Sequence, residues 1–252
     1  MRNLKITIVG NSVGLRVRPP KAHPNNKNYG VLLEEMLQEK YPDTMVFVKN
    51  LCIGRGTLWD ILEKRGDILN TFPNYYVVNL GVTDASTREI PLWFSNIVNG
   101  NRPSFFKKIL RGLYIHIIRK VRPQLVLLRG KTTWTSKKNF ENYFDKFIGY
   151  LVKEANARII IISINSTNKR IEDELPGSTK NYIEYNELIK TVADKYNAYY
   201  LDFSDLVHEI HAPDGIHFSV EGHAILSNRI FSIIDREESQ KYFSNSPINS
   251  IT

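Results

Sequence analysis

The chain has 252 residues, of which 42% are hydrophobic and 24% charged, and its formal net charge is +8. These values are typical of a globular protein with a large core, and they exclude extensive disorder. The single cysteine, Cys52, excludes an internal disulfide framework and a zinc site made of several cysteines. No apolar stretch approaches the ~18 residues of a membrane span, and the N-terminus lacks the apolar core of a signal peptide. We therefore expect a soluble, cytoplasmic protein.

Strand-like and helix-like runs alternate along the chain. Strands are predicted at 4–9, 45–49, 75–80, 124–128, 158–164 and 199–202, and helices at 29–41, 57–69, 139–155, 182–196 and 222–234. Because the strands are apolar throughout and most are separated by helices, they favour a parallel sheet covered on both faces. We expect one α/β domain over residues 1–236, followed by a mobile tail over residues 237–252.

The positive charge is concentrated in a basic segment of about residues 90–138. Between Ile90 and Lys138 there is no Asp or Glu but eleven Lys or Arg, so the rest of the chain carries 23 basic against 26 acidic residues. Apolar residues recur at helical spacing over 105–120, which predicts an amphipathic helix with a cationic rim.

Several interpretations of this helix stay open. It either packs on the core with a basic outer face, covers the active site as a lid, or binds an anionic ligand or an anionic membrane at residues 102–122. The protein would then be peripheral to the membrane. No nucleic-acid motif accompanies the charge, so we do not expect a nucleic acid as partner.

Polar residues follow the predicted strands, at the sheet edge where open α/β folds bind their ligands. They are Ser12 after the first strand, Gly54, Arg55 and Gly56 after the second, Thr83 and Asp84 after the third, and Asp214 and His217 after the last. Together they provide a hydroxyl, an imidazole base, a carboxylate and donors for an oxyanion. This set of groups predicts a nucleophilic hydrolase.

In these blocks the chain resembles the SGNH (GDSL-type) hydrolases, a family of esterases and lipases. The family's Gly-Asp-Ser block is matched by Gly10-Asn11-Ser12 and its turn glycine by NLCIGRGT, while GVTD stands for Gly-x-Asn-Asp and DGIH for Asp-x-x-His. The blocks follow the family's order and span residues 10–217. The resemblance implies a flavodoxin-like, three-layer α/β/α sandwich with a five-stranded parallel sheet, and we expect neither a cofactor nor a metal ion.

The resemblance also implies a catalytic role for three residues. Ser12 would be the nucleophile, His217 the general base that takes its proton, and Asp214 the carboxylate that orients the imidazole. The oxyanion would accept hydrogen bonds from the Ser12 N–H, from an N–H of the glycine-rich turn and from a third side chain.

Two details of this oxyanion site stay open. Thr83 replaces the family's Asn with a shorter hydroxyl, and the loss of one such donor costs ~3 kcal/mol of transition-state stabilisation. In the turn, the spacing from the second strand favours Arg55 as donor, whereas glycine chemistry favours Gly54 or Gly56. We include Asp84 among the candidate substrate-binding residues.

Histidines and tryptophans offer further interpretations. A metal cluster would draw on Asp214 and on four histidines, His208, His211, His217 and His223. The hydrolase blocks already account for this region, so we expect no metal, and we expect His223 to be structural, near the start of the last helix. Trp59, Trp93 and Trp134 could stack on a sugar, but we expect them to be buried.

We expect a serine hydrolase that cleaves acyl esters, acetyl esters above all, on a small-molecule, carbohydrate or lipid-linked substrate through an acyl-enzyme. Two alternatives remain. Because Thr83 replaces the family's Asn, one alternative is an SGNH domain with weakened catalysis that binds glycans or transfers acyl groups to sugars. The basic segment keeps open a protein that docks on membranes without esterase activity.

Overall fold

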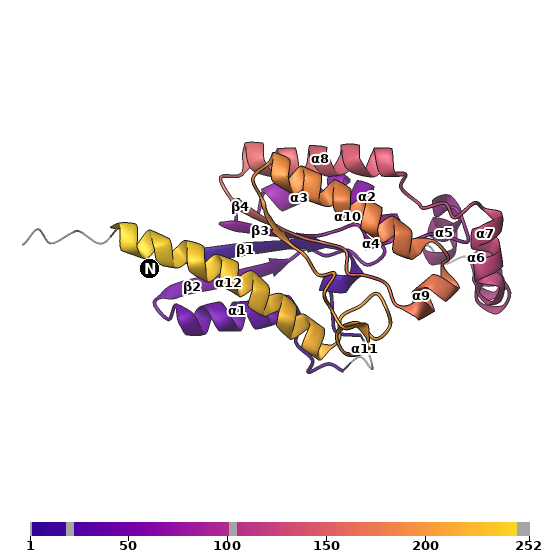
Figure 1. Ribbon diagram of the computed structural model, residues 1–252, viewed down its shortest axis with the longest axis horizontal. Helices are drawn as coiled ribbons and strands as arrows, with labels where there is room; N and C mark the ends of the chain where they lie inside the picture. The colour runs from indigo at the N-terminus through magenta and orange to yellow at the C-terminus, as the bar shows by residue number, and fades with distance from the viewer. Residues whose placement is uncertain (1, 19–22, 101–104, 246–252) are drawn as a thin grey trace, which may run out of the picture.

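The structure is a computed structural model, and it describes residues 2–18, 23–100 and 105–245. In this part of the chain, five parallel strands form one sheet in the order β2-β1-β3-β4-β5, with helices on both faces (Figure 1). The strands are β1 (Arg2–Gly10), β2 (Thr44–Asn50), β3 (Tyr75–Asn79), β4 (Arg158–Ile162) and β5 (Tyr199–Leu201). The predicted three-layer α/β/α sandwich with a five-stranded parallel sheet is confirmed.

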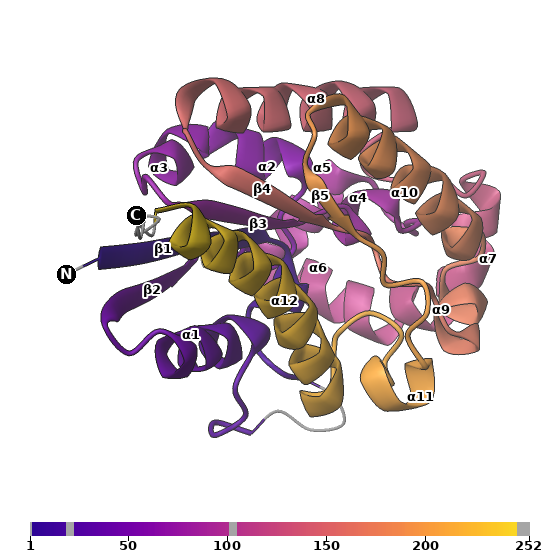
Figure 2. The ribbon, with the colours of Figure 1, turned by 60° about the vertical axis from the view of Figure 1, so that its left-hand side comes forward.

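The helices on the two faces come from different parts of the chain. One face carries α1 (Tyr29–Lys40) and α12 (Val220–Asn245), and the other carries α2 (Leu58–Glu63), α3 (Arg65–Leu69), α8 (Lys137–Glu154) and α10 (Ser178–Lys195) (Figures 1 and 2). Side chains start several of these helices: Asn28 caps α1, and Thr57 and Asp60 form a capping box on α2. Lys64 separates α2 from α3, where the sequence predicted one helix over 57–69.

The strand register brings the site loops together. Ile8 pairs with Asn50 on β2, and Gly10 pairs with Asn79 on β3. Because the strands are parallel, the segments that follow β1, β2 and β3 all leave the sheet at the same edge. These segments carry the 3-10 turn η1 (Ser12–Gly14), the loop before α2 and the short helix α4 (Val82–Ala85).

The strand predicted at 124–128 is wrong, because these residues belong to helix α7 (Arg122–Leu128). Pro123 occupies the first turn of α7, where its missing N–H has no cost. Only Val126 of this helix is buried, whereas Leu128 is 83% exposed. A short apolar run without periodicity does not distinguish a strand from a helix, and here the helix is the outcome.

The predicted tail is wrong over residues 237–245, since α12 continues to Asn245. Glu238 on this extension is 1% exposed and accepts a hydrogen bond from the Tyr75 hydroxyl at 2.6 Å. A polar residue that points inward breaks the amphipathic pattern, which is why the end of the helix was missed. The rest of the expected tail, residues 246–252, lies outside the described residues.

The basic segment forms a group of helices beyond the carboxyl ends of the strands (Figure 1). It contains α5 (Leu92–Asn99), α6 (Phe105–His116), the 3-10 turn η2 (Ile118–Val121) and α7. Phe105, Ile109 and Leu113 of α6 are 81%, 53% and 42% exposed. Leu110 and Tyr114 of the same helix are partly buried, so the predicted apolar face of α6 packs against the protein only in part. None of the helices within the described ranges has the length and apolar character needed to cross a membrane.

Candidate active site

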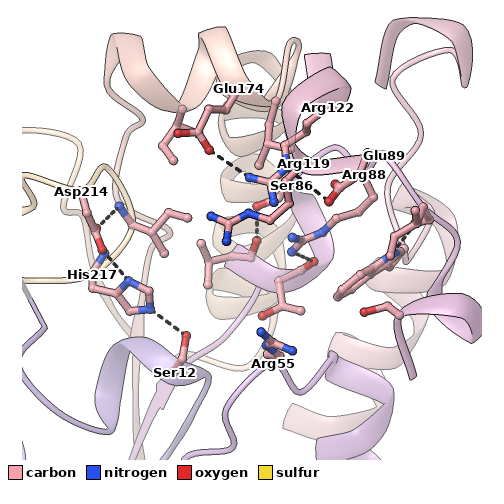
Figure 3. Close-up of a pocket in the computed structure, with 18 of the residues that line it drawn as sticks. Ser12, Arg55, Ser86, Arg88, Glu89, Arg119, Arg122, Glu174, Asp214 and His217 are labelled. Carbon is pink, nitrogen blue, oxygen red and sulfur yellow. Dashed lines mark hydrogen bonds and ion pairs between the residues drawn. The ribbon is translucent and has the colours of Figure 1, made fainter. Parts of the chain in front are cut away.

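Ser12, His217 and Asp214 form a continuous chain of hydrogen bonds (Figure 3). Ser12 Oγ lies 3.0 Å from His217 Nε2, and His217 Nδ1 lies 2.8 Å from Asp214 Oδ2. With the proton on Nδ1 donated to the carboxylate, the lone pair of Nε2 faces the serine hydroxyl. This arrangement can draw the proton from Ser12 and activate its oxygen as a nucleophile.

The turn from Asp214 to His217 accounts for the spacing of the two residues. Asp214 Oδ1 accepts hydrogen bonds from the backbone N–H groups of Ile216 at 2.9 Å and His217 at 2.6 Å. Gly215 has a φ of +74°, and a Cβ there would clash with Asn168 Oδ1. Burial raises the pKa of Asp214, but the hydrogen bonds from His217 and Ile216 outweigh it and the pKa is lowered. The carboxylate is therefore ionised at neutral pH.

Asn11 connects the three loops that surround the nucleophile, a role that the sequence did not reveal. Its fully buried side chain donates to the Gly56 carbonyl at 2.6 Å and accepts from the Gly81 N–H at 3.1 Å. An amide can donate and accept at once, whereas an ionised carboxylate can only accept. The asparagine that replaces the family's aspartate is thus suited to this bridge. Its only signal in the sequence is its place directly before Ser12.

The turn after β2 directs Arg55 towards the nucleophile. The Gly56 N–H donates to the Ile53 carbonyl at 3.4 Å, so Gly54 and Arg55 are the central residues of the turn. Arg55 has a φ of +62° and lines the same pocket as Ser12, whereas Gly54 and Gly56 line a neighbouring hollow. The Gly56 N–H is already bonded to the Ile53 carbonyl, which leaves the N–H groups of Gly54 and Arg55 as candidate oxyanion donors of the turn, and the pocket lining favours Arg55.

Thr83 and Asp84 occupy different environments, although they are adjacent in sequence. Thr83 lines the pocket with Ser12. Asp84 is fully buried, and its carboxylate accepts hydrogen bonds from the Leu58 N–H at 3.1 Å and from the Thr135 hydroxyl at 2.6 Å. Burial raises the pKa of Asp84 to about 6, although both hydrogen bonds lower it. Asp84 thus binds the first N–H of α2. It does not line the pocket, which corrects the expectation that it contacts the substrate.

Charged side chains dominate the pocket of about 350 Å³ that contains Ser12 and His217. Six arginines and three carboxylates line it: Arg18, Arg55, Arg88, Arg119, Arg122, Arg170, Glu89, Glu174 and Asp214. Figure 3 places Arg88, Arg119 and Arg122 across the pocket from Asp214 and His217. The basic segment thus forms one wall of the site. The sequence indicated its charge but not that two of its arginines, Arg119 and Arg122, would line the pocket beside Arg88.

Arg122 and Glu89 hold this wall together. Arg122 donates from Nε to Glu89 at 3.2 Å and from Nη1 to Glu174 at 2.9 Å. The Tyr114 hydroxyl donates to Glu89 at 2.6 Å. Both Arg122 and Glu89 are largely buried, with side chains 17% and 5% exposed. The network joins α6, α7 and α9 (Lys169–Glu174) to the loop that follows α4.

The histidines that were considered for a metal cluster have separate partners. His208 Nε2 lies 2.7 Å from the Ser166 hydroxyl, and His211 Nδ1 accepts from a backbone N–H of its own turn, in α11 (His208–His211). His223 is fully buried in α12, where Nδ1 accepts from the Tyr29 N–H at 3.2 Å. The structural role expected for His223 agrees with this placement.

The tryptophans are less buried than expected. Trp59 and Trp93 are 47% and 64% exposed. Trp134 lines the pocket and donates from Nε1 to the Ile90 carbonyl at 3.0 Å. The guanidinium of Arg88 lies over its ring, 4.1 Å from the centroid.

Comparisons with known proteins agree with this geometry. The profile of the GDSL-like lipase/acylhydrolase family matches residues 8–225. An acetylxylan esterase from Geobacillus stearothermophilus, Axe2, has a similar structure, with 17% identity, a TM-score of 0.61 and coverage of 91% of this chain and 93% of that chain. A lipase/acylhydrolase from Enterococcus faecalis has 17% identity, a TM-score of 0.60 and coverage of 94% and 97%. A comparison with curated protein sequences gave no significant match.

Proposed function

Because the chain belongs to the GDSL-like lipase/acylhydrolase family and is a carboxylic ester hydrolase of this SGNH type, we propose that it removes acetyl or similarly small acyl groups from a carbohydrate through an acyl-enzyme at Ser12. The observation that carries the proposal is the hydrogen-bonded chain from Ser12 through His217 to Asp214. A carbohydrate is supported by the acetylxylan esterase among the similar structures and by the polar lining of the pocket.

Acylation begins when the Ser12 oxygen attacks the ester carbonyl carbon while its proton moves to His217 Nε2. The resulting imidazolium is stabilised by the ionised Asp214 at Nδ1. Ser12 is the first residue of the turn η1, and the N–H groups that begin a helical turn lack partners within it. This N–H and those of Gly54 and Arg55 are therefore the donors for the oxyanion.

Collapse of the tetrahedral intermediate breaks the bond to the sugar oxygen, which leaves as an alcohol with the proton from His217 Nε2. Water then attacks the acyl group on Ser12, with His217 as base again, and the carboxylic acid is released as the serine regains its proton. Thr83 lies in the pocket with a hydroxyl where the family has an amide. We expect the three backbone donors, the N–H groups of Ser12, Gly54 and Arg55, to carry most of the oxyanion stabilisation.

The test compares two serines that both lie beside a histidine. Ser12→Ala should lower kcat by ~10³-fold or more with 4-nitrophenyl acetate and with acetylated xylooligosaccharides. Ser166→Ala is the matched control, because Ser166 bonds to His208, whose Nδ1 has no partner among the described residues. A fluorophosphonate probe should label Ser12 and not Ser166. Equal activity of wild type and Ser12→Ala would reject the proposal.

We also propose that α6 docks the protein on an anionic membrane surface. Phe105, Ile109 and Leu113 follow one another at a spacing of four residues, so they form one exposed apolar stripe on the helix. Lys108 and Arg111 are exposed beside it. Residues 105–138 carry ten Lys or Arg and no Asp or Glu. Arg119 and Arg122 line the pocket, and the other eight provide a charge that complements an anionic lipid surface.

Vesicle binding tests this second proposal. The wild type should sediment with vesicles that contain phosphatidylserine and much less with phosphatidylcholine alone, and added salt should weaken the binding. The double change Ile109→Ser and Leu113→Ser should remove most of the binding. Val152→Ser, at an equally exposed position on α8, is the control. Absence of binding by the wild type, or dimerisation through this stripe, would reject the proposal.

A further inference from the structure

The pocket around Ser12 has an excess of positive charge that hydrolysis of a neutral ester does not require. Six arginines face three carboxylates, Glu89, Glu174 and Asp214. Pockets for neutral ligands are mostly apolar with a small number of polar groups. A set of guanidinium groups inside a pocket is instead typical of sites that bind carboxylates or phosphates.

The three carboxylates do not neutralise all of the arginines. Glu89 and Glu174 both accept from Arg122, and Glu174 also accepts from Arg170 at 2.6 Å. Asp214 accepts from His217 through its side chain. Arg122 and Arg170 are therefore paired, and the charges of the other arginines remain.

Three arginines of the pocket have no ion pair or hydrogen bond in the part of the chain that the structure describes, and they are Arg18, Arg55 and Arg119. Arg18 Nε is buried there without an acceptor. Burial lowers the pKa of Arg18, and the positive charges of Arg16 and Arg55 lower it further, against the opposite effect of Asp214. Like charges thus gather at one pocket, and an anion bound between them would relieve their repulsion.

Arg88 lies with Arg119 and Arg122 on one side of the pocket (the arginine wall), and its neighbours orient it. It donates from Nη2 to the Thr83 carbonyl at 2.9 Å and lies over the Trp134 ring, while its Nε is buried without an acceptor in the described structure. Thr83 is the residue that replaces the family's amide donor. The arginine wall is therefore joined directly to the oxyanion side of the site.

On the basis of ester hydrolysis at Ser12, we infer that the sugar substrate is anionic: it carries a carboxylate or a phosphate group, which Arg18, Arg55 and Arg119 bind beside the ester. The three residues come from the segment after η1, from the turn after β2 and from η2, so they surround the pocket from separate loops. Each guanidinium can donate two parallel hydrogen bonds to either anion. The anionic group would fix the sugar so that its acyl ester meets the Ser12 oxygen.

Direct binding tests this inference without turnover. Calorimetric titration of the Ser12→Ala protein uses three probes: glucose, glucuronate and glucose 1-phosphate. At least one anionic probe should bind ~10-fold or more tightly than glucose, and its affinity should fall with added sodium chloride. Stronger binding of glucuronate assigns the carboxylate, and stronger binding of glucose 1-phosphate assigns the phosphate.

Two arginine variants in the Ser12→Ala background locate the site. Arg119→Gln should weaken binding of the anionic probe ~10-fold. Arg111→Gln removes the same charge from an exposed position on α6 outside the pocket, and it should leave the affinity unchanged. Thermal unfolding verifies that both variants are folded.

The outcomes separate this inference from the proposed function. Equal binding of glucose and the anions, no binding of any probe, or equal losses in Arg119→Gln and Arg111→Gln would overturn the anion site. Anion binding together with an inactive wild type would remove the proposed hydrolysis and leave the anion site standing. Hydrolysis of neutral acetyl esters without anion binding would remove the anion site and leave the proposed hydrolysis standing.

Discussion

The two walls of the pocket are built in different ways. The triad wall (Ser12, Asp214 and His217) lies on short turns at the carboxyl edge of a buried sheet, and each of its groups is held by the next. The arginine wall (Arg88, Arg119 and Arg122) comes from the segment between β3 and β4, which extends away from the sheet (Figure 2). This segment exposes apolar side chains such as those of Ile109 and Leu128.

This difference separates chemistry from recognition. The proton transfer that we propose needs the atoms of the triad wall within hydrogen-bond distance of one another, and they lie at such distances in the structure. The arginine wall is held largely by the ion pairs of Arg122, and we propose that its position selects the substrate. In the proposed function, the sheet edge therefore sets the reaction, and the helices that extend from it set the substrate. Four changes test this division, from the largest expected effect to the smallest.

Asp214→Asn should lower kcat by ~10⁴-fold, close to 5 kcal/mol of transition-state stabilisation. The amide no longer stabilises the imidazolium and favours the wrong tautomer of His217, while the turn keeps its shape. Steady-state kinetics with 4-nitrophenyl acetate measure the loss, and circular dichroism verifies the fold. A loss below tenfold would mean that His217 works without its carboxylate.

His223 is fully buried near His217, and we expect it to lower the stability of the protein in acid. Burial lowers the pKa of His223 to about 4, and the charge of His217 adds to the effect. Between pH 4 and pH 6.5 the unfolded chain binds a proton that the folded protein does not, so the free energy of unfolding rises with pH across this window. The contribution of His223 amounts to ~3 kcal/mol.

The variant His223→Gln isolates the contribution of His223 to the pH dependence of the free energy of unfolding. Glutamine can still accept from the Tyr29 N–H but does not titrate, so the difference between wild type and variant should change by ~3 kcal/mol from pH 7 to pH 4. Urea denaturation at both pH values measures it. Asp84 has the opposite sign, because its raised pKa of about 6 makes its ionised form unfavourable as the pH rises from 4 to 6. Asp84 is present in both proteins, so its contribution cancels when the free energies of unfolding of wild type and variant are subtracted. If the two free energies changed with pH in parallel, the prediction would be contradicted.

Arg122→Met tests the arginine wall. The change leaves the buried Glu89 without its cationic partner, and we expect the free energy of unfolding to fall by ~2 kcal/mol. Arg111→Met is the control, since Arg111 is exposed, and it should cost less than ~0.5 kcal/mol. Urea denaturation of both variants provides the comparison. Equal effects would show that the Arg122 ion pairs do not hold the wall.

Leu128→Ser should have the smallest effect, below ~0.5 kcal/mol, because this side chain is 83% exposed on the outer side of the arginine wall. Val126→Ser, two residues away on the same helix, is fully buried and should cost several times more. Thermal unfolding of the two variants measures the contrast. A large loss for Leu128→Ser would mean that another part of the protein covers this surface.

Particular residues illustrate how far the sequence alone reaches. The apolar runs at β1, β2, β3, β4 and β5 predicted the sheet, and the central strands β3 and β4 are buried almost throughout. Ser12, Asp214 and His217 were identifiable since each follows a strand or stands in a short turn with fixed spacing. Three features required the structure: helix α7, where an apolar run of strand type folds as a helix, the bridge made by Asn11, and the extension of α12 over Glu238.

The sequence by itself determined the parallel sheet and the residues of the triad wall, because both depend on local patterns: apolar runs, turns and a spacing of three residues. Only the tertiary structure decided which arginines line the pocket and which of them the carboxylates neutralise. These pairings join residues that are far apart in the chain, such as Arg122 and Glu174. Their energies depend on burial and on distance, which no short stretch of sequence specifies.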